Sequence, residues 1–285
     1  MLRTIHSTCL KPGRRLPVNN KIDKEQVRRR FARHLAAYDS LAVVQQRIAE
    51  RLAGRFSGYV PEAFGRVLEV GCGTGFLTRE LEKIVPMETL YLNDLVPEAL
   101  PALKERLSGE GCTSSIELLS GDADALSLPG GLDLVMSASA LQWLEDLNGF
   151  FAKTAAAMKP GGWFVFNLFG PENLHQVKTL TGNGLEYLPA GKLRALLEKY
   201  FDVVEFHEET IRQEFDTPFD VLRHLQQTGV TATGDFRWTS GSLRAFERDY
   251  AVRYGENGKV GLDWDVIYVI ARKKVPGIEP KNHTR

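Results

Sequence analysis

Apolar side chains follow two different periods along the chain, and the period changes near residue 60. Between residues 22 and 60 they recur at intervals of three and four: Val27, Phe31, Leu35, Tyr38, Leu41, Val44, Ile48 and Leu52. This spacing places them on one face of a helix. We therefore predict two N-terminal helices, with a break near residues 38–40 where Asp39 or Ser40 caps the second helix.

From Arg66 onward the pattern becomes one of short apolar strands with helix-length segments between them. The predicted strands are 67–70, 90–93, 115–119, 132–137 and 163–169, and the predicted helices are 76–85, 97–108 and 146–158. Alternation of this kind is typical of a parallel sheet that is covered by helices on both faces.

The last third of the chain departs from this alternation. It predicts a helix at 189–200, a strand at 202–214, helices at 217–228 and around 240–250, and a strand at 264–272. About 45 residues separate the last two strands, far more than a hairpin loop requires. We expect the intervening segment to form a helical cap beside the active site.

These segments predict an α/β fold with a doubly wound, mostly parallel, seven-stranded Rossmann-like sheet, N-terminal helices and a helical cap insertion. The expected divisions are a disordered basic tail (1–21), an N-terminal helical cap (22–60), the core (61–215), the cap insertion (216–258), the last core strand (259–274) and a tail (275–285).

The formal net charge of zero conceals a basic N-terminal end. Residues 1–55 contain thirteen Lys and Arg against four Asp and Glu, and such an excess can attract an acidic partner. No apolar run approaches the roughly 18 residues needed to cross a membrane, and no secretory signal is evident. The three cysteines and six histidines lack metal-ligand spacing, so we expect no metal, and so few cysteines suit the cytoplasm.

A glycine-rich turn follows the first predicted strand. The sequence VLEVGCGTG places Gly71, Gly73 and Gly75 between that strand and a helix, where glycine allows a tight turn and close approach of a ligand. The dinucleotide pattern GxGxxG does similar work, but here Phe76 stands at its third glycine. A carboxylate at Glu69 suits a cationic amino-acid ligand better than a pyrophosphate.

Further polar residues follow the next strands. Asp94 ends the second strand, where it can accept both hydroxyls of a ribose. Asp122 follows the third strand, where it can accept from an adenine amine, and Ser137 ends the fourth strand beside the switch point of the sheet.

This series resembles the Class I S-adenosylmethionine-dependent methyltransferases over about residues 65–170. The resemblance implies that Asp94 and Leu95 hold the ribose and one adenine face, and that Asp122 and Ala123 hold the adenine edge. Around the methionine end it implies Glu69, Gly71, Cys72, Gly73 and Gly75, with Cys72 as a small filler and not a nucleophile.

The outer segments resemble the malonyl-acyl carrier protein O-methyltransferases of biotin synthesis. The resemblance rests on VRRRFARHLAAYDSLAVVQQRIAERL, SASALQWLEDL, the LHQ of 174–176 and FDTPFDVLRHLQQTGVTAT, and it reaches from about residue 24 to 273. Asn93 departs from it, because an apolar residue usually precedes the ribose-binding aspartate, and the tail 1–21 is extra.

The resemblance implies methyl transfer from S-adenosylmethionine to a malonyl carboxylate, with no metal. A carboxylate is already ionised near neutral pH, so we expect no catalytic acid or base. We expect Tyr38 to close over the methionine end of the cofactor, and Gln142 and Trp143 to line the acceptor side. His175 is a further candidate there, and Arg223 is the first candidate for a bidentate bond to the carboxylate.

The implied partner is an acidic acyl carrier protein that carries the malonyl group. Its candidate docking residues are Arg28, Arg29, Arg30 and Arg33. We expect neither a membrane nor a nucleic acid as partner, because no NPPY-type tetrad follows the fourth strand and no aromatic–basic strip is present.

Several other functions stay open at this point. One is a methyltransferase acting on a small molecule such as a quinone precursor or a fatty acid, and another is a protein-modifying assembly factor. A cofactor-binding regulator without turnover would be free to lose Asp94 or Asp122, yet both are present. The GxGxG spacing argues against a nicotinamide oxidoreductase.

Overall fold

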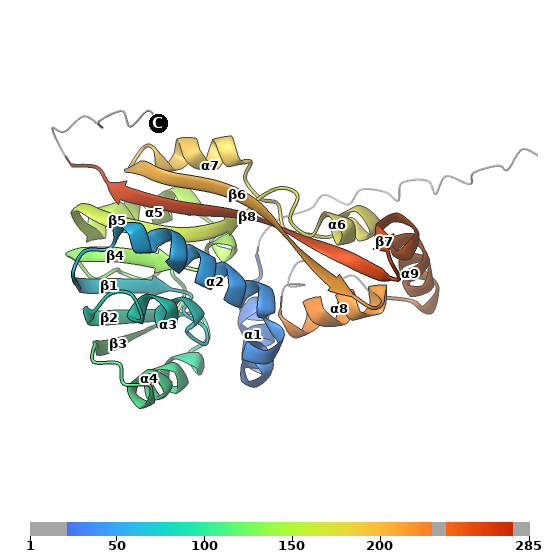
Figure 1. The fold of residues 1–285 in the computed structure, drawn as a ribbon, viewed down its shortest axis with the longest axis horizontal. Coiled ribbons are helices and arrows are strands. Elements are labelled where there is room, and N and C mark those ends of the chain that lie inside the picture. The colour runs from blue at the N-terminus through green and yellow to red at the C-terminus, as the bar shows by residue number, and fades with distance from the viewer. Residues whose placement is uncertain (1–21, 230–237, 276–285) are drawn as a thin grey trace, which may run out of the picture.

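A computed structural model describes residues 22–229 and 238–275 of the chain (Figure 1). The tail predicted at 1–21 and nearly all of the tail predicted at 275–285 lie outside the described residues. No helix within the described ranges combines the length and the apolar character that a membrane span requires.

Seven long strands form one sheet in the order β3-β2-β1-β4-β5-β8-β6. They are β1 (Phe64–Val70), β2 (Met87–Asp94), β3 (Ser115–Ser120), β4 (Leu132–Ser137), β5 (Met158–Phe169), β6 (Phe201–Phe215) and β8 (Lys259–Lys273). The first five run parallel, whereas β8 pairs antiparallel with both β5 and β6. A two-residue strand, β7 (Gly255–Glu256), pairs with the end of β8. The predicted doubly wound fold is therefore confirmed.

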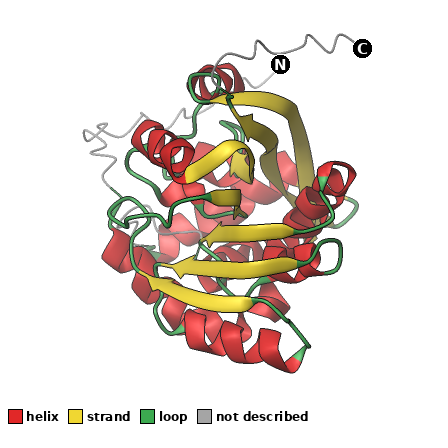
Figure 2. Ribbon diagram, turned by 90° about the vertical axis from the view of Figure 1, so that its left-hand side faces the viewer, coloured by secondary structure: helices red, strands yellow, loops and turns green. Residues whose placement is uncertain are grey.

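Helices cover both faces of this sheet (Figure 2). One face packs against α2 (Val43–Phe56), α3 (Phe76–Glu82) and α4 (Ala99–Gly109), and the other packs against α5 (Leu147–Ala157) and α7 (Ala190–Leu197). The central strands are buried on both sides, which explains why their sequences read as continuous apolar runs. A short 3-10 turn follows α2, η1 (Ser57–Tyr59), and another precedes α5, η2 (Leu141–Trp143).

The break between the two N-terminal helices differs from the prediction. Helix α1 (Lys24–Leu41) continues through residues 38–40, and Ala42 leaves the helical conformation at φ −87°, ψ 47°. Asp39 caps nothing because it forms an ion pair with Arg106 on α4, 2.6 Å away. The hydroxyl of Ser40 donates a hydrogen bond to the carbonyl of Ala37 in the preceding turn. The chain therefore bends at Ala42, between α1 and α2.

Strands β6 and β8 extend past the rest of the sheet and carry the inserted helices at their far end (Figure 1). Along the chain, β6 and β8 are separated by α8 (Pro218–Gln227) and α9 (Ser240–Tyr254). The apolar face of α9 packs on β8, and Tyr250 donates a hydrogen bond to the Gly261 carbonyl at 2.8 Å. Helix α8 packs against α1, so the insertion and the N-terminal helices meet beside the parallel sheet.

A short helix that the sequence pattern did not predict, α6 (His175–Thr181), lies along β8. Side chains hold it there, since Gln176 donates to Asp263 at 2.7 Å and the backbone of Asp265 donates to Asn173 at 3.3 Å. Seven residues carry too little periodicity to be recognised as a helix without these tertiary bonds.

Candidate active site

The glycine turn after β1 requires glycine for different reasons at different positions. Gly71, Gly73 and Gly75 all have positive φ, at 69°, 52° and 85°. A Cβ at Gly71 would lie 2.2 Å from the Cβ of Ala140, and one at Gly75 would lie 2.3 Å from Leu103. A Cβ at Gly73 would meet nothing within 4 Å. Gly71 and Gly75 are therefore packing positions, whereas Gly73 faces open space.

Asp94 connects this turn to the end of β2. Its carboxylate accepts hydrogen bonds from the backbone of Gly73 and of Val96, both at 2.7 Å. Burial raises the pKa of Asp94, and these backbone donors oppose the rise. Asn93, the departure from the family pattern, donates to the carbonyls of Leu119 and Gly121. It thereby ties β2 to the loop after β3.

Glu69 lies inside the sheet beneath the turn. Its side chain is buried and accepts a hydrogen bond from the hydroxyl of Thr78 on α3. Burial raises the pKa of Glu69 to about 8. The free protein therefore holds this group mostly neutral at pH 7, and a cation bound above it would favour the carboxylate.

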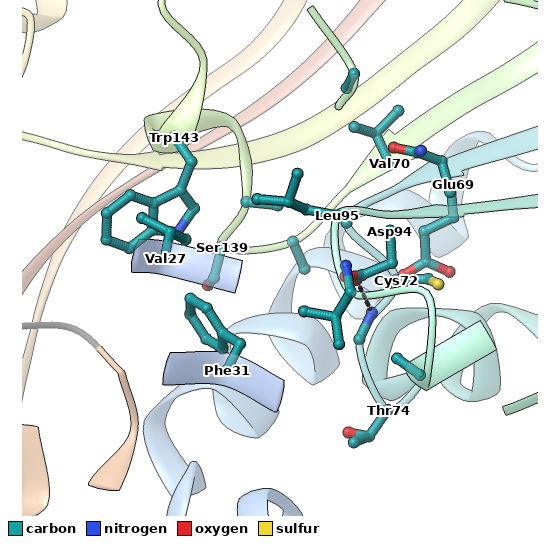
Figure 3. A pocket seen from close by; sticks show the side chains of 18 of the residues that line it. Val27, Phe31, Glu69, Val70, Cys72, Thr74, Asp94, Leu95, Ser139 and Trp143 are labelled. Atoms are coloured by element: carbon teal, nitrogen blue, oxygen red, sulfur yellow. Dashed lines mark hydrogen bonds between the residues drawn. The ribbon is translucent and has the colours of Figure 1, made fainter. Parts of the chain in front are cut away.

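A cavity opens over these strand ends. Figure 3 shows Asp94, Cys72 and Glu69 on one side of it, and Val27 and Phe31 of α1 with Trp143 and Ser139 on the other. The sequence-predicted residues that line it are Tyr38, Glu69, Gly71, Cys72, Gly73, Asp94, Leu95, Asp122, Ala123 and Trp143. We call this space the first cavity.

Aromatic rings from α1 form the roof of the first cavity. Tyr38 stacks on Phe76 with ring centroids 6.1 Å apart, and Phe31 meets Trp143 edge to face at 6.1 Å. Burial raises the pKa of Tyr38, so its hydroxyl keeps its proton. Helix α1 therefore covers the strand ends with neutral, mostly apolar side chains.

Lys24, at the first turn of α1, reaches across the cavity to the loop after β3. Its ammonium lies 2.7 Å from the Asp122 carboxylate and also pairs with Asp124. Burial lowers the pKa of Lys24, but the hydrogen bonds that its ammonium donates to these two carboxylates, with their negative charge, outweigh burial and raise the pKa. This ion-pair group fastens α1 over the site.

A second, smaller cavity adjoins the first. The two share Phe31, Tyr38, Gln45, Ser139 and Trp143 as wall residues. The second cavity continues to Gln142, Phe169, Asn173, Leu185, Tyr187, Thr228 and Trp264. The predicted acceptor residues Gln142 and Trp143 are therefore brought to this boundary.

Four sequence-predicted site residues line neither cavity. Gly75 turns toward Leu103, and the hydroxyl of Ser137 is buried and donates to the Val70 carbonyl at 2.8 Å. His175 packs edge to face on Tyr254. Arg223 points outward, with its guanidinium over Phe219 and paired with Asp220 at 2.8 Å.

The orientation of α8 explains why Arg223 does not lie at the predicted acceptor site. Val221 and Leu225 bury one face of this helix against the core, so Arg223 falls on the exposed side. The structure thus removes the predicted arginine fork from the acceptor site. No group of three or more metal-ligating side chains occurs among the described residues.

Comparison with known proteins places this geometry in a family. Residues 68–166 match the family model of a methyltransferase domain. A malonyl-acyl carrier protein O-methyltransferase of Bacteroides helcogenes is 36% identical over 273 residues, covering 89% of this chain and 100% of the relative. The corresponding Porphyromonas gingivalis protein is 37% identical over 255 residues, covering 88% and 97%. This chain belongs to the malonyl-acyl carrier protein O-methyltransferase family.

Solved structures support the fold assignment of this methyltransferase. The YcgJ protein of Bacillus subtilis superposes with a TM-score of 0.56 at 13% identity, covering 79% of this chain and 99% of that one. The N-methyltransferase NodS of Bradyrhizobium japonicum, solved with S-adenosyl-L-homocysteine, gives 0.52 at 17% identity, covering 87% and 98%. The resemblance drawn from the sequence is confirmed, and the enzyme is an S-adenosylmethionine-dependent methyltransferase.

Several residues of the two cavities were not predicted as site residues. Val27, Phe31 and Leu35 line the first cavity, and their helical spacing with Tyr38 was the available signal. Gln45 and Ser139 stand inside the quoted family motifs, but Trp264 and Tyr187 carry no local signal. These last two reach the site only because β8 and the segment before α7 fold over it.

Proposed function

We propose that this methyltransferase transfers the methyl group of S-adenosylmethionine to the free carboxylate of a malonyl group carried by acyl carrier protein. The product is a methyl ester for biotin synthesis. The observation that carries the proposal is the pair of adjoining cavities, of which the second is the smaller and shares five wall residues with the first. The names of the relatives point to the same acceptor.

We assign the first cavity to the cofactor. Gly71, Cys72 and Gly73 surround the methionine end, with Glu69 beneath and Tyr38 above. Asp94 and Leu95 take the ribose and one adenine face. This assignment is supported by the open space at Gly73 and by the carboxylate of Asp94 beside it.

Asp122 and Ala123 take the adenine edge in this assignment. The Lys24 ion pair leaves room for that role, because a carboxylate has about four lone-pair sites and Lys24 uses only part of them. Gly75 and Ser137 then act indirectly, by holding the turn and the end of β4 in place.

The chemistry requires alignment more than acid–base assistance. A carboxylate oxygen attacks the methyl carbon opposite the sulfur, and the electron pair of the breaking bond stays on sulfur. No proton moves, so no general base is needed. Holding both reactants at the shared wall of the two cavities can supply roughly 7–11 kcal/mol in favourable cases.

The test is a transfer assay with labelled S-adenosylmethionine and malonyl, succinyl and acetyl carrier proteins. We expect base-labile methyl incorporation with the malonyl form, and none with the acetyl form, which lacks a free carboxylate. Equal transfer to succinyl would remove the malonyl assignment, and cofactor binding without any transfer would refute the carboxyl methylation.

We further propose that the basic side chains of α1 dock the acidic carrier protein. Arg28 pairs with Glu25 at 2.9 Å and lies 3.8 Å from Glu98, and Arg29 pairs with Glu25 at 2.8 Å. These acids reduce the positive charge that Arg28 and Arg29 present. Reversing Arg30 and Arg33 to Glu should raise KM for the carrier protein and weaken its salt dependence. Unchanged KM and salt dependence would exclude this surface. A cytoplasmic site of action is part of the same proposal.

A further inference from the structure

The second cavity is the part of the molecule that the acceptor carboxylate must enter if the proposed function is correct. Every side chain that the structure places on its wall is uncharged. A carboxylate entering this space leaves water without meeting a lysine or arginine on the described part of the wall. Its negative charge must then be balanced by hydrogen-bond donors and by the sulfonium of the cofactor.

Several buried polar atoms on this wall lack a hydrogen-bond partner among the described residues. They are Trp264 Nε1, Ser139 Oγ, Gln45 Oε1 and Gln142 Oε1. Trp264 is 1% exposed, and its indole N–H can only donate. A buried polar group without a partner is unfavourable, and of these four atoms the indole nitrogen and the hydroxyl are the ones that can donate to a carboxylate.

Ser139 is fixed in an unusual conformation at the boundary of the two cavities. Its φ is +53°, a region that non-glycine residues rarely adopt. Its backbone N–H donates to Asn167 at 2.8 Å, and its carbonyl accepts from Gln142 at 2.6 Å. The backbone of Ser139 is therefore bonded on both sides, while its hydroxyl remains available to a ligand.

We propose that neutral donors, the Trp264 indole N–H and the Ser139 hydroxyl, hold the acceptor carboxylate in place of a basic side chain. This inference rests on the proposed function, because it names how the same site recognises its substrate. It also replaces the role that the sequence suggested for Arg223.

Uncharged recognition suits this reaction. The carboxylate oxygen forms a bond to the methyl carbon while the sulfur–carbon bond breaks, so one negative and one positive charge disappear together. A guanidinium would stabilise the full charge of the bound carboxylate more than the reduced charge of the transition state, and would therefore slow the step. Neutral donors position the carboxylate with less of this penalty, and the adjacent sulfonium supplies the attraction.

The test compares Trp264→Phe and Ser139→Ala with the wild-type enzyme and with Trp163→Phe. The control removes the same indole N–H at a tryptophan that packs on Phe56 and Arg272 and lines neither cavity. For each protein, kcat and KM are measured with malonyl carrier protein. The affinities for S-adenosylhomocysteine, and for malonyl and acetyl carrier proteins with that product bound, are measured by calorimetry.

We expect each cavity variant to lose roughly 10- to 100-fold in kcat/KM, the range for one hydrogen bond to a charged group. Binding of S-adenosylhomocysteine should be unchanged in Trp264→Phe, because Trp264 lines only the second cavity. In both variants the malonyl carrier protein should lose affinity while the acetyl form does not. A variant that fails to fold would lose cofactor binding as well, and in that case the other variant decides.

Wild-type kcat/KM in both variants, or equal loss of malonyl and acetyl affinity, would overturn the proposal. A wild-type enzyme that transfers no methyl group to malonyl carrier protein would instead refute the proposed function and this inference with it.

Discussion

Replacing Gly71 by alanine should mainly lower the stability of the fold, whereas replacing Gly73 in the same turn should mainly weaken cofactor binding. Gly71 and Gly73 both have positive φ, at 69° and 52°, which costs an alanine about 1–2 kcal/mol. A methyl group restricts the unfolded chain equally at both positions, so that effect cancels in their comparison. The difference between the two variants therefore depends on the surroundings of each added Cβ.

At Gly71 the new methyl would lie 2.2 Å from the Cβ of Ala140. Ala140 has no side-chain torsion with which to withdraw, so the backbone between β4 and η2 must move. Overpacking of this kind costs about 1–3 kcal/mol. We expect Gly71→Ala to lower the free energy of unfolding by this amount more than Gly73→Ala does.

At Gly73 the new methyl meets nothing within 4 Å in the protein, but it projects into the space that we assign to the cofactor. The fold should tolerate it apart from the φ cost, whereas binding should not. Overpacking against a ligand by about 1–3 kcal/mol corresponds to a rise of roughly 5- to 150-fold in Kd.

Urea denaturation without ligand and calorimetry with S-adenosylhomocysteine separate the two effects. The reasoning is refuted if Gly73→Ala binds the product as tightly as wild type. It is also refuted if Gly71→Ala is no less stable than Gly73→Ala.

Two further perturbations test the electrostatics of the site. The pKa of Glu69 is raised to about 8 in the free protein, and a cationic ligand should lower it. Affinity for S-adenosylmethionine should therefore rise as the pH increases toward about 8, and binding should release protons. In Glu69→Gln, calorimetry in several buffers should show a weaker pH dependence of the affinity and a smaller proton release. Lys24→Met should lower the free energy of unfolding by about 1–2 kcal/mol, because it leaves the partly buried Asp122 and Asp124 without their cation. The exposed pair of Arg29 with Glu25 provides the control, since Arg29→Met should change stability by less than about 0.5 kcal/mol in the same urea titration. Equal losses in the two variants would contradict the role given to Lys24.

The sequence by itself determined the parallel core and the positions of the residues that we assign to the cofactor. Strand periodicity and helix periodicity are local properties, and a parallel sheet brings the carboxyl ends of its strands to one edge. Gly71, Gly73, Asp94 and Asp122 each lie at a strand end or within three residues after it. Their order along the chain was therefore enough to place them around one cavity.

The tertiary structure decided most of the wall of the second cavity, which we assign to the acceptor. Its residues lie on segments far apart in the chain: Tyr38 on α1, Ser139 after β4, Tyr187 before α7 and Trp264 on β8. Nothing local indicates that an indole N–H within a buried strand has no partner, because that depends on which helices pack around it.

The same reason explains the predictions that the structure corrected. Which face of α8 is buried is fixed by its contacts with the core and α1, and these leave Arg223 in solvent. The bend between α1 and α2 falls at Ala42 because Asp39 finds a partner on α4 instead of capping a helix. Sequence specifies what lies next to a strand end, whereas packing between distant elements specifies which side chains face the substrate.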